Sequence, residues 1–172
     1  EMTLRRTERQ LQKDLDVAKV ELERLGQPLF LSNSIPWKAR NQFNGKEETL
    51  SLPLMAIGSA RLEPNAEFSV PSPLVDTVTT FTRDYCTIFQ RMNADGDMLR
   101  VATTVRTEDG RRAVGTFIPR QNPEGEANPV IAAVLRGETF VGLAKVLNDS
   151  HVTSYTPLWD SPAKREVVGM LY

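Results

Sequence analysis

Cationic side chains interrupt several apolar, strand-like segments in the second half of the chain. Arg91 ends the segment TIFQR, Arg100 lies in MLRVATTV, and Lys145 interrupts VGLAKV. A guanidinium can hold a carboxylate through two parallel hydrogen bonds, and a lysine offers a point charge. These residues either point to solvent, as the polar side of a half-covered antiparallel sheet does, or converge on a pocket for a small anion.

Hydroxyl and aromatic side chains lie in the same kind of segment. Thr153 and Tyr155 are two residues apart, so they share one face of a strand. Their hydroxyls could provide the hydrogen bonds that a buried carboxylate requires, and Trp37 and Phe89 could wall the pocket. The candidate ligand-binding residues are therefore Arg91, Arg100, Lys145, Thr153, Tyr155, Phe89 and Trp37.

Other kinds of site have little support in the sequence. Cys86 is the single cysteine and His151 the single histidine, so a metal cluster has no second soft ligand. The segment 93–97, NADGD, is typical of a hairpin turn and lacks the further oxygen ligands of a calcium loop. Catalytic elbows and phosphate loops are missing, and the formal net charge is −1. We expect no enzyme activity, no metal, no cofactor and no nucleic-acid partner.

A long helix is predicted over residues 2–25. The segment has no Gly or Pro, and Gly26 followed by Pro28 predicts its end. Its apolar residues recur at three- and four-residue spacing from Leu4 to Leu25. So narrow a stripe is typical of a dimer seam or of a helix that lies on its own sheet, and both remain open.

The rest of the first half is predicted to form short elements. We expect a short helix or loop at 29–45 and the first strand or two at 48–61, with Pro53 favouring an edge or a break. Ser72 and Pro73 predict the N-cap and first residue of a helix that ends near residue 84. Its apolar face would include Val78 and Phe81.

Turn signals divide the second half into short strands. Asp95–Gly96, Asp109–Gly110, Asn148–Asp149 and Ser161–Pro162 predict turns, and Asn128–Pro129 predicts the start of a short helix that Gly137 ends. The sequence therefore predicts an α+β fold, with five or six antiparallel strands, two or three short helices and the long N-terminal helix.

Several segments together resemble one known family. They are WKARNQFNG, LSLPLMAIG, VDTVTTFTRD, TIFQRMNADGDMLRVATTVRTEDGRRAVGTFIP, NPEGEANPVIAAVLRGETFVGLAKV and VTSYTPLWDSPAKREVVGMLY. The chain resembles the single-Cache, PAS-like sensor domain of bacterial methyl-accepting chemotaxis proteins and related sensor kinases. The resemblance implies a curved antiparallel sheet with short helices over the ligand face. It also implies that residues 1–27 form a helix continuing from a removed membrane span, and residues 28–172 the sensor domain.

The resemblance also implies a function. Such a domain is the periplasmic, ligand-binding part of a transmembrane signalling protein, and it binds a small organic acid such as acetate, propionate, lactate or pyruvate. The acid would enter between the sheet and residues 29–85. Leu143 stands where an arginine is expected and Lys145 where an aromatic residue is expected, so the ligand is not carried over. The alternative is a structural module that dimerises through the N-terminal helix and binds no ligand. Any membrane contact would involve flanking segments only.

Overall fold

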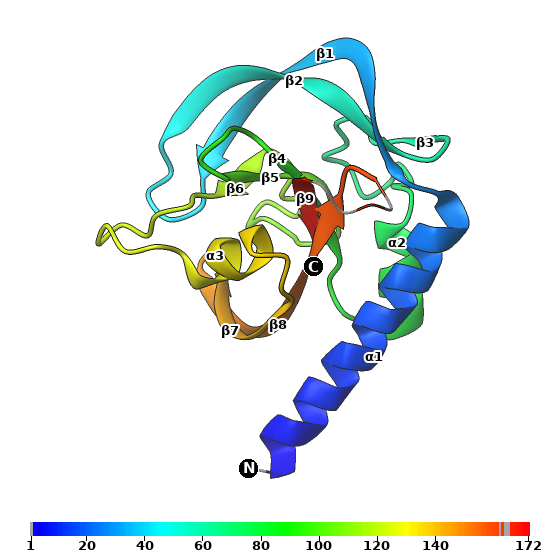
Figure 1. Ribbon diagram of the computed structural model, residues 1–172, viewed down its shortest axis with the longest axis vertical. Helices are drawn as coiled ribbons and strands as arrows, with labels where there is room; N and C mark the ends of the chain where they lie inside the picture. The colour runs from blue at the N-terminus through cyan, green and yellow to red at the C-terminus, as the bar shows by residue number, and fades with distance from the viewer. Residues whose placement is uncertain (1, 162, 164–165) are drawn as a thin grey trace.

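The computed structural model describes residues 2–161, 163 and 166–172, with the side chains of the first helix described from residue 8 onward. Three helices and nine strands form within these residues (Figure 1). In chain order they are α1 (Met2–Leu25), β1 (Pro28–Asn41), β2 (Glu47–Ile57), β3 (Ala60–Arg61), α2 (Val75–Thr82), β4 (Thr87–Arg91), β5 (Met98–Thr103), β6 (Thr116–Ile118), α3 (Pro129–Leu135), β7 (Phe140–Val146), β8 (Asp149–Trp159) and β9 (Val167–Leu171). The α+β prediction is confirmed.

The strands form one sheet in the order β3-β2-β1-β6-β5-β4-β9-β8-β7. Neighbouring strands are antiparallel except for β1 and β6, which run parallel. The long β1–β2 hairpin arches across one end of the molecule, and α1 and α3 lie on different sides of the sheet (Figure 1). The sheet thus has nine strands, where the sequence predicted five or six.

The prediction of a short helix or loop at 29–45 is wrong. Most of the segment is β1, which pairs with β2 along its length and is interrupted by a register shift between Phe30 and Ser34. Most of its side chains are exposed or half-buried, so the strand has no apolar alternation that a sequence could reveal. It is held by its hairpin partner β2 and by the distant strand β6.

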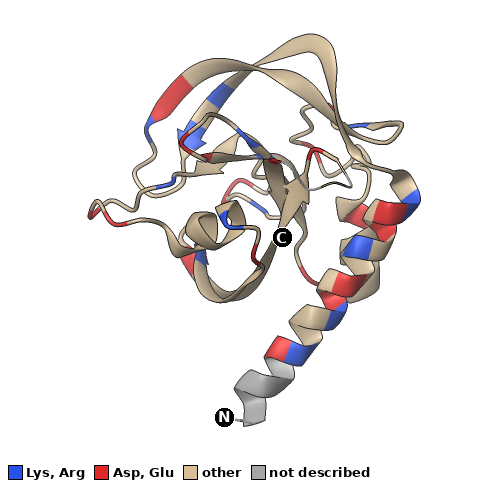
Figure 2. Cartoon of the chain, in the orientation of Figure 1, with Lys and Arg blue, Asp and Glu red and all other residues tan. Residues whose placement is uncertain are grey.

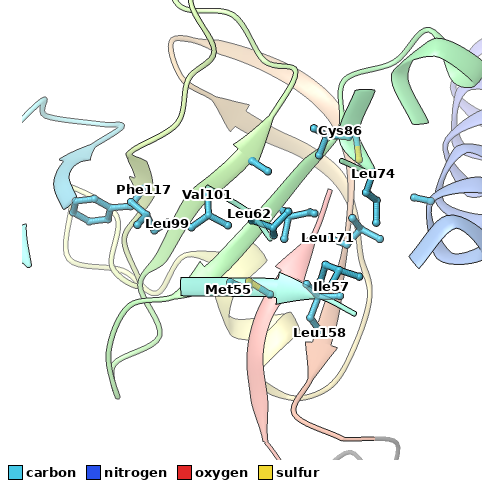
Figure 3. Packing of buried hydrophobic residues seen from close by; sticks show 14 of the residues in the cluster. Met55, Ile57, Leu62, Leu74, Cys86, Leu99, Val101, Phe117, Leu158 and Leu171 are labelled. Carbon is cyan, nitrogen blue, oxygen red and sulfur yellow. The ribbon is translucent and has the colours of Figure 1, made fainter. Parts of the chain in front are cut away.

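One face of the sheet carries the larger hydrophobic cluster, here called the first core (Figure 3). Buried members shown there are Met55, Ile57, Leu62, Leu74, Cys86, Leu99, Val101, Phe117, Leu158 and Leu171. From α1, Leu15 and Ala18 are buried in this core, and Leu22 and Leu25 pack against it. The apolar stripe of α1 therefore lies on its own domain from Leu15 onward. Charged side chains of both signs alternate along the helix (Figure 2).

A second core fills the opposite face, under α3 and against β8. Its buried members are Phe89, Met98, Ile118, Val130, Ile131, Val134, Tyr155, Val167 and Met170. The predicted start of α3 is confirmed, because the Asn128 side chain accepts hydrogen bonds from the backbone N–H groups of Val130 (3.0 Å) and Ile131 (3.3 Å). Gly137 follows the helix with a φ of 81°.

The predicted start of α2 is wrong. The helix begins at Val75, after Leu74, whose φ is 66°, and no side chain caps it. The Ser72 backbone N–H instead donates to the Asp76 carboxylate (2.8 Å). Phe81 does not face the core, since 75% of its surface is exposed. The predicted β4–β5 and β7–β8 hairpins are confirmed; Pro162, of the last predicted turn, lies outside the described residues.

Candidate functional site

Arg100 is a charged side chain in the middle of the second core. It lies on the central strand β5, only 1% of its surface is exposed, and its ladder partner on β4 is Phe89. The guanidinium carbon is 5.1 Å from the centre of the Phe89 ring, within range of a cation–π contact. Burial lowers the pKa of Arg100, and the neighbouring Tyr155 and Tyr172 partly offset this effect. A buried cation of this kind is costly unless a counter-charge accompanies it.

The guanidinium has few partners for its five N–H groups. Nη1 donates to Thr116 Oγ1 (3.0 Å) and Nη2 donates to Gln42 Oε1 (2.8 Å). The Nε atom of Arg100 is buried without a hydrogen-bond partner. None of the ion pairs formed by the described residues includes Arg100. The site therefore offers a positive charge and an unused donor, both shielded from solvent.

Aromatic rings close the other side of this cluster. Tyr155, on β8, is fully buried, and its hydroxyl has no hydrogen-bond partner. Its ring stacks on Tyr172 with 4.9 Å between centres and lies 6.0 Å from Phe89. Burial raises the pKa of Tyr155 to about 12, although the Arg100 charge opposes the rise. At neutral pH the hydroxyl keeps its proton and is a free donor.

Gln42 separates this cluster from two surface pockets. It lines both a pocket of about 940 Å³, which Thr116 also lines, and a second of about 320 Å³. Its Nε2 donates to the backbone oxygen of Lys145 (3.2 Å) while its Oε1 accepts from Arg100. Arg100 itself lines neither pocket, but both side chains that accept hydrogen bonds from it, Gln42 and Thr116, line the larger one.

The sequence was compared with models of known protein families. The family model described as the Cache 3/Cache 2 fusion domain matches residues 3–172. The chain belongs to this family. This match confirms the resemblance drawn from the sequence. Cache domains are extracytoplasmic sensor domains and are generally not enzymes. Searches of curated proteins and of solved structures returned no significant match. None of the described helices is both long and apolar enough to cross a bilayer.

The Cache domain brings three of the seven candidate residues together, namely Arg100, Phe89 and Tyr155. Thr153 lies on the same face of β8 as Tyr155, but its Oγ1 donates to the Gly142 backbone oxygen (2.8 Å). The Lys145 side chain is exposed and lines the smaller pocket.

Two other candidates lie outside the Arg100 cluster. Arg91 donates to the backbone oxygens of Asn93 (2.9 Å), Ala94 (2.8 Å) and Val167 (3.2 Å), so it ties the β4–β5 turn to β9. Trp37 is 8% exposed in the first core, on the opposite face of the sheet. The structure therefore does not bring either of them to the buried guanidinium.

Sequence reasoning missed three residues of this Cache domain that surround Arg100. Gln42 lies just after β1, in a segment not recognised as part of the sheet, and a glutamine in a turn is usually solvated. Thr116 reaches Arg100 because β6 lies between β1 and β5. Tyr172 follows β9, and its alternation with Met170 was the one signal that could have placed it on the second-core face.

Proposed function

We propose that this Cache domain senses a small organic acid whose carboxylate binds Arg100. The observation that carries the proposal is a fully buried guanidinium with no carboxylate partner among the described residues and an unused Nε. Folding tolerates such a group at a large cost in free energy, and a bound anion would recover that cost. The same carboxylate could accept a hydrogen bond from the free hydroxyl of Tyr155.

For the acid to reach Arg100, the Gln42 side chain must move away from the guanidinium. Its Oε1 now accepts from Nη2 as a carboxylate oxygen would, and the Gln42 side chain lines both pockets. Phe89 and Phe140 flank Tyr155, so they would contact a short apolar tail. A tail of one to three carbons suits a site surrounded by buried rings, which favours acetate, propionate, lactate or pyruvate as ligand.

A signal could leave the site through β8. Tyr155 faces the second core, and its neighbour Ser154 faces the opposite way, into a pocket that α1 also lines. Movement of Tyr155 on binding would therefore displace the strand against which α1 packs. Shifts of about 1–2 Å at such helix contacts are part of the known repertoire of switching proteins. Signalling requires only that the acid bind one arrangement better than the other. We place this event in the periplasmic part of a chemoreceptor or sensor kinase.

Calorimetry against acetate, propionate, lactate and pyruvate tests the proposal. At least one acid should bind, and Arg100→Met should weaken it by about 30-fold or more, which corresponds to about 2 kcal/mol for a charge-assisted contact. Arg61→Met, at an exposed arginine of β3, is the matched control and should leave affinity unchanged. Absence of heat with all four acids, or equal binding by the Arg100 variant, would refute the proposal.

A further inference from the structure

A separate pocket of about 600 Å³ lies between α1, the segment that follows α2, and β8. It is on the opposite side of β8 from Tyr155, and the one residue that it shares with the Arg100 site is Tyr172, whose ring stacks on Tyr155. Leu11, Leu15 and Val152 contribute to its apolar walls. Two carboxyl groups line the same space, Asp14 from α1 and Asp84 from the segment after α2.

Two buried polar atoms of this pocket lack hydrogen-bond partners. Asp14 is 9% exposed; its Oδ1 accepts from Gln10 Nε2 (2.9 Å), but its Oδ2 is buried with no hydrogen bond. Ser154, 5% exposed, also lines the pocket, and its Oγ has no partner. No Lys or Arg whose side chain is described pairs with either carboxylate. An unsatisfied hydroxyl and an unsatisfied carboxylate oxygen thus share a space with a second carboxylate.

Asp84 also opposes the ionisation of Asp14. Burial and the neighbouring Asp84 together raise the pKa of Asp14 to about 6, while the hydrogen bond from Gln10 opposes the rise. The other titratable groups at the pocket are His151, Tyr85 and Tyr172. His151 meets Tyr85 edge to face, with 6.4 Å between ring centres. Near neutral pH the pocket therefore holds negative charge with no described cation to balance it.

We propose that this pocket binds a primary amine, with the ammonium group between Asp14 and Asp84 and the alkyl chain along the apolar walls. An ammonium has three N–H donors, which match the Asp14 Oδ2, the Asp84 carboxylate and the Ser154 Oγ. A hard metal ion fits less well, because such an ion needs six or more oxygen ligands and gains nothing from apolar walls. The bound amine would link α1 to the body of the domain, because its two carboxylates come from different elements. This site does not depend on the acid-binding proposal.

Calorimetry of the 172-residue chain with n-butylamine at about pH 8 tests the assignment. The control ligand is n-butanol, which has the same alkyl chain but no charge. The amine should bind and the alcohol should not. Asp14→Asn and Asp84→Asn should each weaken amine binding by about tenfold or more, and Ser154→Ala by about threefold. Asp16→Asn, an exposed acid on the same helix that interacts with Gln12, is the matched control and should change nothing. Arg100→Met should also leave amine binding intact.

A pH series gives a second readout. Amine affinity should fall as the pH is lowered through about 6, because Asp14 then takes up a proton, and the Asp14→Asn variant should lose this dependence. Equal binding of n-butanol, unchanged affinity in both aspartate variants, or no binding of the amine would overturn the proposal. Binding of Ca²⁺ in competition with the amine would also overturn it, since it would identify a metal site.

Discussion

Two buried arginines, Arg112 and Arg100, have opposite surroundings. Arg112 forms a bidentate ion pair with Asp76, with Nη1–Oδ1 at 2.7 Å and Nη2–Oδ2 at 3.0 Å. It also donates to the backbone oxygens of Glu67, Val70 and Thr103 at 3.0–3.1 Å. Arg100 is just as buried but has two neutral acceptors and an idle Nε.

The difference separates an arginine that serves the fold from one whose bonding is incomplete. Buried polar groups in folded proteins nearly always have partners, and the exceptions call for a reason. Arg112 is not such an exception, because it forms five hydrogen bonds, which join the loop before α2 and α2 itself to the end of β5. An external anion would give Arg100 what Asp76 gives Arg112.

The largest expected effect is on stability at Arg112. Arg112→Met should lower the free energy of unfolding by about 3 kcal/mol, because it leaves Asp76 and three backbone oxygens without their donor. Urea denaturation measures this loss. Arg111→Met is the matched control: that exposed arginine pairs with Glu67, and its loss should cost less than about 1 kcal/mol. A stability equal to that of the parent would show that the buried ion pair is not a stabilising feature.

The sequence predicted the elements whose signals are local. Gly26 marks the end of α1, Asn128 caps α3, and Asp95–Gly96 turns the β4–β5 hairpin. The strand β1 was missed because its side chains are mostly exposed, so neither its hairpin with β2 nor its pairing with the distant strand β6 has a signal within the segment. Local chemistry is therefore readable from the sequence, whereas pairing imposed by the rest of the sheet is not.

The candidate site was predictable to the same extent. A charge within an apolar strand correctly marked Arg100 as unusual, but the same signal marked Arg91, which binds backbone oxygens of a turn. Arg112 follows a turn and gave no signal, although it is as buried as Arg100. Gln42 joins the cluster only because β1, β6 and β5 are neighbours, which depends on topology.

Gln42→Glu should make Arg100 resemble Arg112. The new carboxylate would stand where the Gln42 Oε1 accepts from Nη2, so stability should rise by about 1 kcal/mol and acid binding should weaken by about tenfold or more. Thermal unfolding and calorimetry measure the two effects. Gln42→Ala, the control, removes the acceptor without adding charge and should retain acid binding. If Gln42→Glu still bound acids as tightly as the parent, Arg100 would not be the anchor.

The two arginines should also respond differently to acid. Burial acts to raise the pKa of Asp76, but hydrogen bonds from Arg112 and Ser72 and the Arg112 charge outweigh it, so the pKa lies below its ordinary value of 3.8. The ion pair therefore stabilises the fold above that value, and this contribution is lost as the pH falls through the lowered pKa. Urea midpoints of the parent and Arg112→Met should converge below about pH 4, whereas Arg100→Met should show no such convergence. If the urea midpoint of Arg100→Met also converged with that of the parent at low pH, the two arginines would not differ in their dependence on a carboxylate of the fold.

The smallest expected effect is at the free hydroxyl of Tyr155. Tyr155→Phe deletes a buried donor without a partner, so stability should change by less than about 0.5 kcal/mol, while acid binding should weaken by about fivefold if the hydroxyl meets the carboxylate. Tyr85→Phe, at a tyrosine that is 47% exposed, is the control and should affect neither quantity. A clear loss of stability in Tyr155→Phe would mean that this hydroxyl serves the fold, as Arg112 does, and that Arg100 alone is left to hold the acid.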